Sequence, residues 1–216
     1  MGCCCFLIIM PSPVAHSLIG LTLGCAWFLP HALDWRGLAR QVWVQRGWLL
    51  LCIVLANAPD VDYLFGIPRG NLNYYHQVIT HTLGWIVSVS VCVWIFIRLA
   101  PPPACAGTGQ RHAWNRGQTW LGFLFILAVT GSHLIADYFC ADTSPPCGIM
   151  IAWPFSDRTW TSPVSLFPAP AKKTWADLWT RHNVWVVTME LLITLPLLVA
   201  VLLWKRRRSC PPSCPP

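Results

Sequence analysis

The chain has 216 residues, of which 55% are hydrophobic and only 11% are charged, whereas an average soluble domain carries roughly 25% charged residues. This composition excludes an ordinary water-soluble globular protein. The formal net charge is +7, but the basic residues stand in short clusters between long apolar runs, which is typical of membrane proteins. We therefore expect a multipass membrane protein with no nucleic-acid partner.

Five apolar segments are candidates for membrane spans, which need roughly 20 residues each as helices. In chain order they cover Val14 to Leu29, Gly47 to Ala58, Leu83 to Ala100, Trp120 to Phe139 and Val184 to Trp204. The second is too short alone and reaches span length only if it continues through Pro59 and the acidic cluster after it. Because lipid cannot satisfy backbone polar groups, helices are expected throughout. The predicted fold is an all-α, multipass membrane bundle of four to five spans.

The segments between the predicted spans differ in composition. A basic loop with Arg36, Arg40 and Arg46 follows the first span, and residues 101–117 form a loop rich in Pro and Gly. A long stretch from Ala141 to Asn183 is rich in Pro and Trp. Within it, apolar residues alternate with charged ones in a pattern that predicts a short helix on the membrane surface; they are Trp175, Leu178, Trp179, Lys172, Lys173, Asp177 and Arg181. We expect one domain over residues 1–208 and a disordered tail over 209–216.

Several ionisable side chains lie within or beside the apolar runs, where they are costly and by default indicate function. The candidates for a metal site are His16, Asp60, Asp62, His76, His81, His133 and Asp137. The last two are four residues apart in a predicted helix, so they share one face and can reach one ion. Purely structural roles stay open for each residue alone: a packing pair, a solvated helix-ending turn or interfacial histidines. Glu190, in the last run, is a candidate for an outer partner of the metal site or for a hydrogen bond to a neighbouring helix, and we expect the latter.

The predicted topology sorts the charges. With five spans, all of these His and Asp residues, together with Asp157, fall on one side of the membrane, and ten of the 15 Lys and Arg residues fall on the other. The positive-inside rule then makes the basic side cytoplasmic. We therefore predict a protein of the cell inner membrane, with a cytoplasmic C-terminus and a metal site on the extracytoplasmic face.

Several short motifs, taken in order, resemble a known family. They are Pro59-Asp60-Val61-Asp62, the segment His76 to Thr82 with its His-x-x-x-Thr-His pattern, His133 to Asp137, and Gly148 followed by Trp153-Pro154-Phe155-Ser156. Together they resemble the membrane-bound, YdjM-like metal-dependent hydrolases over about residues 13–160. The chain departs from that family at Gln77, Val78 and Thr82, and its segment between Asp137 and Gly148 is longer. A more distant similarity is to zinc-dependent phospholipases C and single-strand nucleases.

The resemblance implies an α-helical membrane protein that hydrolyses an unspecified substrate. Mixed imidazole and carboxylate ligands suit Zn²⁺, with Mn²⁺ as the alternative, and the number of ligands allows one to three ions. We expect metal-activated water to attack an ester or phosphoester, possible substrates including membrane lipids. Asp157 is expected as a ligand or general base, Asp62 as a ligand or an orienting group, and Arg158 with Arg69 as holders of an anionic group. The alternative is a non-catalytic metal-binding membrane protein, either a transporter component or a scaffold.

Overall fold

The computed structural model describes residues 11–31, 34–71, 74, 76, 79–101, 115–140, 148–168, 170–171, 174 and 176–206. Within these ranges all regular structure is helical, and strand-like pairing is limited to two isolated bridges, Cys140 with Phe167 and Ile149 with Trp160. The predicted all-α class is therefore confirmed. The tail predicted for residues 209–216 lies outside the described ranges.

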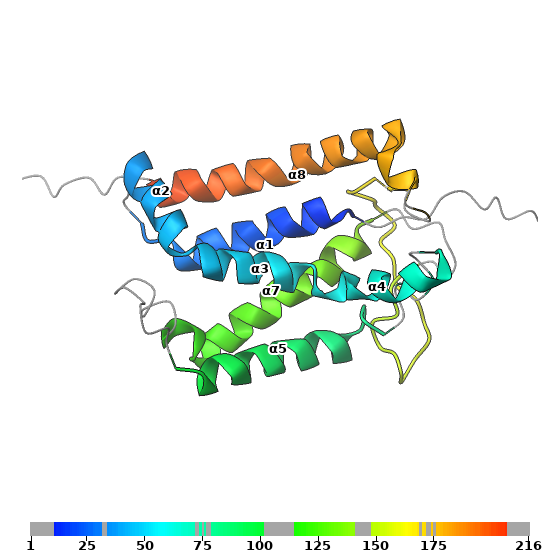
Figure 1. Ribbon diagram of the computed structural model, residues 1–216, viewed down its shortest axis with the longest axis horizontal. Coiled ribbons are helices and arrows are strands. Elements are labelled where there is room, and N and C mark those ends of the chain that lie inside the picture. The colour runs from blue at the N-terminus through cyan, green and yellow to red at the C-terminus, as the bar shows by residue number, and fades with distance from the viewer. Residues whose placement is uncertain are drawn as a thin grey trace, which may run out of the picture.

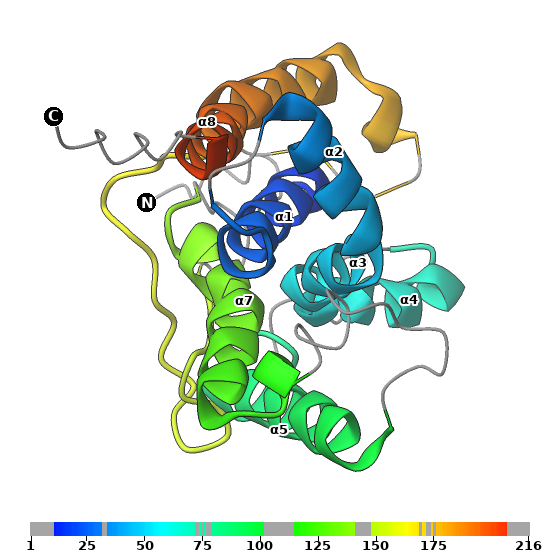
Figure 2. The ribbon, with the colours of Figure 1, turned by 90° about the vertical axis from the view of Figure 1, so that its left-hand side faces the viewer.

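The helices run along the long axis of the molecule in layers, with α8 on one side, α5 on the opposite side and α1 in the middle (Figure 1). The α-helices are α1 (Pro13–Phe28), α2 (Trp35–Val44), α3 (Arg46–Ala56), α4 (Tyr63–Gly66), α5 (Leu83–Leu99), α7 (Trp120–Tyr138) and α8 (Arg181–Arg206). Short 3₁₀ turns are η1 (Ala58–Asp62), η2 (Ile67–Arg69) and η3 (Asp177–Trp179). Seen end-on, α1 is surrounded by α3, α7 and α8 (Figure 2), and it packs most extensively on α3 and α8.

Close packing of α1 against α3 depends on two small residues one turn apart. A Cβ atom placed on Gly20 would lie 2.5 Å from the carbonyl oxygen of Cys52 and 2.8 Å from the Cβ of Ala56. At Gly24 the nearest atom would be the Cys52 sulfur, at 3.1 Å. Small residues spaced by four are the usual means by which helices in membranes approach closely. The contact therefore requires glycine at position 20.

The number of spans differs from the prediction. Two described helices, α7 and α8, are long and apolar enough to cross a membrane, and α2 with α3 would be a third if this pair, bent by 68°, forms one span. Helices α1 and α5 are apolar but have only 16 and 17 residues. At 1.5 Å per residue they are about 24 and 26 Å long, against a hydrocarbon core of about 30 Å. The four to five predicted spans are therefore not confirmed; two to three helices meet the requirements.

Three segments between the predicted spans differ from expectation. The basic segment with Arg36 and Arg40 is the helix α2 and not a loop, because Asp34 caps it by accepting a hydrogen bond from the Gly37 amide. The apolar segment starting at Gly47 does not continue through Pro59 as an α-helix: α3 ends at Ala56 and a 3₁₀ turn follows. The predicted surface helix is reduced to the turn η3 in its described part, and α8 begins directly after it at Arg181.

A carboxylate inside α8 connects this helix to the start of α1. Glu190 is fully buried, and its side chain accepts hydrogen bonds from the Ser12 amide, at 2.6 Å, and from the Ser12 hydroxyl. Ser12 is also the N-cap of α1, because its hydroxyl oxygen accepts from the Val14 amide. The helix-to-helix hydrogen bond expected of Glu190 is thus confirmed. It holds the first turn of α1, which carries His16.

Basic residues gather at one end of the bundle and stack on tryptophans. The Arg116 guanidinium lies 4.5 Å from the centroid of Trp27 at the end of α1, and it donates a hydrogen bond to the Trp27 carbonyl. The Lys205 ammonium lies 4.6 Å from Trp204, and Arg206 lies 4.7 Å from Trp35. Cations are stabilised at helix C-termini, and α1 and α8 both end here. The candidate metal ligands His16 and His133 lie at the opposite end, where α1 begins and α7 ends.

Candidate metal centre

Four segments meet at the end of the bundle where α1 begins and α7 ends. His16 lies in the first turn of α1, Asp60 lies in η1, and His133 and Asp137 lie in the last turns of α7. His81 lies just before α5, whose N-cap is the next residue, Thr82. The sequence separation of the α7 pair places both side chains on one face, as predicted, with the His133 Nε2 atom 3.1 Å from an Asp137 carboxylate oxygen.

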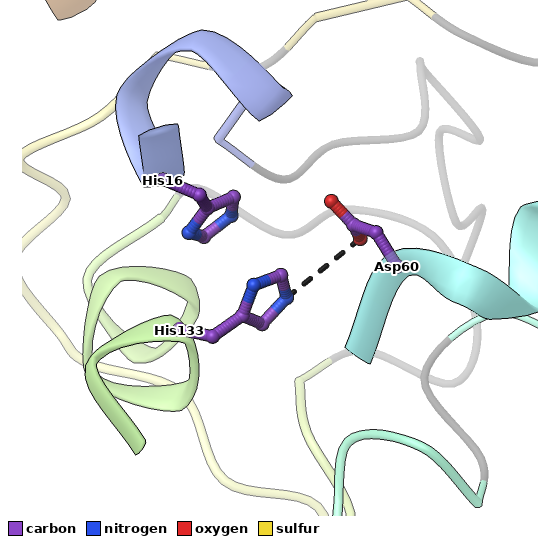
Figure 3. Close-up of side chains that lie close together, drawn as sticks. All are labelled: His16, Asp60 and His133. Atoms are coloured by element: carbon purple, nitrogen blue, oxygen red, sulfur yellow. Dashed lines mark ion pairs between the residues drawn. The ribbon is translucent and has the colours of Figure 1, made fainter. Parts of the chain in front are cut away.

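Five of these side chains converge on one small volume, which we call the inner set: His16, Asp60, His81, His133 and Asp137. The Nε2 atoms of His81 and His133 are 3.1 Å apart. Asp137 lies 3.4 Å from the former and 3.3 Å from the Nε2 atom of His16. One oxygen of Asp60 approaches both His81, at 3.8 Å, and His133, at 3.7 Å. Figure 3 shows His16 and Asp60 with His133, on whose ring the His16 ring stacks with centroids 3.8 Å apart.

The partners of the two central histidines determine where their protons lie. His133 Nδ1 is 2.8 Å from the carbonyl oxygen of Ala56, which only accepts, so this nitrogen carries a proton. The Thr80 hydroxyl donates its single proton to Asp62, at 2.6 Å, and must therefore accept from His81 Nδ1, at 3.0 Å. When both rings are neutral, each Nε2 atom then carries the lone pair of its ring, and the two atoms are 3.1 Å apart. Such an arrangement favours a cation between them.

The inner set fits a divalent metal ion in burial and spacing. The side chains of His16, His81, His133 and Asp137 are at most 1% exposed, and both nitrogens of His16 and both oxygens of Asp137 make no hydrogen bond. Buried polar atoms without hydrogen bonds are costly unless something else compensates them. Tetrahedral ligands at 2.0–2.1 Å from Zn²⁺ are about 3.3–3.4 Å from one another, close to the separations of 3.1–3.8 Å in this set.

A second layer of hydrogen bonds surrounds His81. The Asp62 carboxylate accepts from His76 Nδ1, at 2.9 Å, and from the Thr80 hydroxyl, and one of its oxygens is 3.4 Å from His81 Nδ1. Burial alone would raise the pKa of Asp62, but hydrogen bonds and charge from His76 and His81 outweigh it and hold this pKa well below its usual range. A carboxylate behind a histidine orients the ring and makes it a better ligand.

The structure brings all seven predicted metal ligands together, but in two layers. His76 is close enough to take part, since its ligand atom lies within 4.8 Å of those of Asp60 and His81. However, its Nδ1 atom donates to Asp62, and its Nε2 atom is 2.8 Å from the Tyr63 hydroxyl. His76 and Asp62 therefore support the inner set from outside it.

Three predicted residues are not brought to the cluster. Asp157 and Arg158 are exposed, and neither takes part in the groups of potential metal ligands found among the described residues. The Arg158 guanidinium lies 4.6 Å from the ring of Trp160, on a loop closed by the bridge between Ile149 and Trp160. Arg69 is also exposed, 5.2 Å from the ring of Tyr74.

Two residues of the site were not singled out from the sequence. Thr80 connects Asp62 to His81; it is the threonine of the His-x-x-x-Thr-His pattern, and that motif is the signal that could have marked it. Tyr63 bonds to His76, and burial with the nearby carboxylates raises its pKa well above the usual value, so the hydroxyl stays protonated. Nothing in the sequence distinguishes this tyrosine, because its contact with His76 depends on the fold of η1.

The outer carboxylate offers a first test. We expect Asp62→Ala to weaken metal binding by roughly 10–100-fold, because it leaves His81 and His76 without the group that orients them. The affinity is measured by competition of purified protein against a chromophoric chelator. Asp177→Ala is the control, since that carboxylate bonds to Thr174 in an exposed turn. An unchanged affinity in Asp62→Ala would contradict the supporting role.

Comparison with known proteins identifies the family. The sequence model of the YdjM inner membrane protein family matches residues 10–209, which include every His and Asp of both layers. Neither a curated protein nor a solved structure gives a significant match to the chain. Because the family match covers nearly the whole chain, and candidate spans are present, the chain belongs to the YdjM inner membrane protein family.

Proposed function

We propose that this protein is a membrane-bound, metal-dependent hydrolase that cleaves an ester or phosphoester at the bilayer surface. The observation that supports it is the convergence of three imidazoles and two carboxylates in the inner set, with the Nε2 atoms of His81 and His133 3.1 Å apart. Hydrolysis adds water across the ester bond and releases an acid and an alcohol, so no further reactant is needed.

The inner set would hold the ion through His16, Asp60, His81, His133 and Asp137. Nitrogen and oxygen donors in this mixture suit Zn²⁺ first and Mn²⁺ as the alternative, and five inner groups with His76 nearby allow one to three ions. When bound, such an ion supplies a Lewis acid that lowers the pKa of a bound water from 15.7 toward about 7.

The protein's own groups then have separate roles. Asp62 and His76 hold His81 in one orientation. Asp60 has the most exposed side chain of the inner set, at 8%, and marks the side from which a substrate enters. Arg158 and Arg69 lie outside the inner set, so their guanidinium groups would bind an anionic group of a substrate that extends beyond the metal ion.

We also propose the orientation of the protein. The basic residues around Trp27, Trp35 and Trp204 lie at the end opposite the inner set, and short basic segments remain on the cytoplasmic side during insertion. The metal centre would then lie at the extracytoplasmic face, and the C-terminus would be cytoplasmic.

A second candidate is a non-catalytic metal site that ties α1, α7 and the segment before α5 together. It is favoured by the burial of four members of the inner set, because structural zinc sites are closed and catalytic ones keep an open position. Asp60 is the group that distinguishes the two, since at 8% its side chain is the one member of the inner set more than 1% exposed.

An assay with and without chelator separates the two candidates. We expect purified protein in nanodiscs to hydrolyse at least one class of a panel of phosphomonoesters, phosphodiesters, lipid phosphoesters and carboxylic esters. Activity should disappear with 1,10-phenanthroline and return with added Zn²⁺ or Mn²⁺. The Asp137→Asn variant, which should bind no metal, serves as the inactive control. Metal-loaded protein that hydrolyses none of the panel would contradict the hydrolase and favour the closed structural site.

A further inference from the structure

We propose that an apolar groove between α5 and α7 binds the acyl chain of a long-chain lipid phosphoester whose headgroup reaches the metal centre. This proposal rests on the proposed function, since it names the class of substrate that would be hydrolysed. It concerns a surface that contains none of the metal-centre residues.

The groove has a volume of about 760 Å³, and the twelve residues that line it are apolar except for Tyr138. Leu83 and Val87 line it from α5, and Leu124 and Ile135 line it from α7; all four are exposed. Figure 2 shows α5 and α7 beside each other at the edge of the bundle. An exposed surface of this kind faces hydrocarbon in a membrane protein, so a lipid chain is the ligand that its chemistry matches.

The groove is long enough for one acyl chain. From Leu124 to Tyr138 it follows α7 for 14 residues, or about 21 Å at 1.5 Å per residue. Half of the hydrocarbon core measures about 15 Å, which is the depth that the chains of one leaflet occupy. A long chain fills such a groove from the membrane surface inward, whereas a chain of four carbons does not.

The hollow in α7 comes from small residues. Gly131 lies inside the helix, where glycine costs roughly 0.5–1 kcal/mol relative to alanine. A Cβ atom at this position would meet only the Ile86 side chain, at 3.8 Å, so helix packing does not require glycine here. At Gly20, by contrast, a backbone atom excludes any side chain. Gly131 with Ala128 therefore leaves room on the surface without improving the contact between α5 and α7.

Some residues that line the groove are neighbours of the metal-centre residues in the sequence. Leu134 and Tyr138, which line it, each directly follow one of the α7 ligands, His133 and Asp137. On the other wall, Leu83 follows His81 by two residues. The groove and the ligands therefore share the last turns of α7, and we infer that the polar end of a chain held here lies at that end of the helix. The exposed loop with Arg158 also contributes Ile151 to the groove, on the side where an anionic headgroup would bind.

Photocrosslinking in nanodiscs tests the proposal with a phosphatidic acid that carries a diazirine in its acyl chain. We expect labelling of peptides from residues 83–87 and 124–135, competed at least 10-fold by excess dioleoyl phosphatidic acid but not by the dibutyryl form. A second apolar hollow, lined by Cys92, Ile95 and Leu99 at the other end of α5, is the internal control. Bulk lipid should label it without saturation.

Two variants complete the experiment. Gly131→Phe fills the groove and should abolish the saturable labelling while the metal content stays that of the unmodified protein. Cys92→Phe fills the control hollow and should leave the labelling unchanged. Three results would each contradict acyl-chain binding in the groove. The labelling could be non-saturable and equal at both hollows, the short-chain lipid could compete for it, or saturable labelling could survive in the Gly131→Phe variant. Saturable labelling of a protein that binds no metal would instead refute the hydrolase and leave lipid binding in place.

Discussion

Asp137→Asn should abolish metal binding while leaving the fold intact. The carboxylate lies within 3.4 Å of the ring nitrogens of His16, His81 and His133, so it is the negative charge common to all three imidazoles. Asparagine has nearly the same shape but no charge. Loss of a direct ligand should exceed the roughly 10–100-fold weakening that follows loss of an outer partner. Elemental analysis of purified protein gives the metal content per chain.

His133→Ala should have the same effect on the metal and an additional effect on stability. The substitution removes an inner ligand and leaves the Ala56 carbonyl without its donor, which costs about 1–3 kcal/mol for a buried group. Size-exclusion profiles and circular dichroism separate loss of metal from loss of fold. His182→Ala, in an exposed first turn of α8, is the matched control. Full metal content in both the Asp137→Asn and the His133→Ala variants would show that the inner set is not the metal-binding site.

Gly20→Leu should prevent α1 from packing against α3. The new Cβ atom would lie 2.5 Å from the Cys52 carbonyl oxygen, and a backbone atom cannot rotate away. Overpacking typically costs 1–3 kcal/mol, and occasionally more; here the helices must separate, so we expect a value at or above the top of that range. Because His16 lies one turn before Gly20 on α1, the metal content should fall together with the stability.

The measurement is the thermal unfolding midpoint in detergent, followed by fluorescence of the tryptophans. Gly47→Ala is the control, since a Cβ atom there meets nothing within 4 Å and alanine is favoured in a helix by up to about 1 kcal/mol. Its midpoint should stay the same or rise. If Gly20→Leu unfolded at the same temperature as the unmodified protein, the close approach of α1 and α3 would be wrong.

Local patterns predicted the helical class and the identity of the candidate ligands. The pairing of His133 with Asp137 follows from their spacing on one helix, and no tertiary information is needed for it. The number of spans was predicted less well, because α1 and α5 have only 16 and 17 residues. Hydropathy also does not show that Asp34 caps a helix in the basic segment. Such end effects depend on single hydrogen bonds, which composition does not show.

The division of the ligands into two layers could not be predicted from sequence. Asp60 and Asp62 are two residues apart in a 3₁₀ turn, yet one approaches His133 and the other binds Thr80 and His76. Which carboxylate points inward depends on where η1 lies against α7 and on the segment before α5. Tyr63 was missed for the same reason, since its partner His76 is thirteen residues away in the chain.

The scarcity and placement of charged residues by themselves determined that this is a helical membrane protein with a His and Asp cluster near the ends of its spans. Burying a charge in lipid is costly, so charged residues are rare in membrane spans and their positions are informative. Only the tertiary structure decided which of those residues meet. Convergence of side chains from α1, η1, α7 and the segment before α5 is a property of helix packing, above all of the close contact at Gly20, and the distances between ligands depend on it.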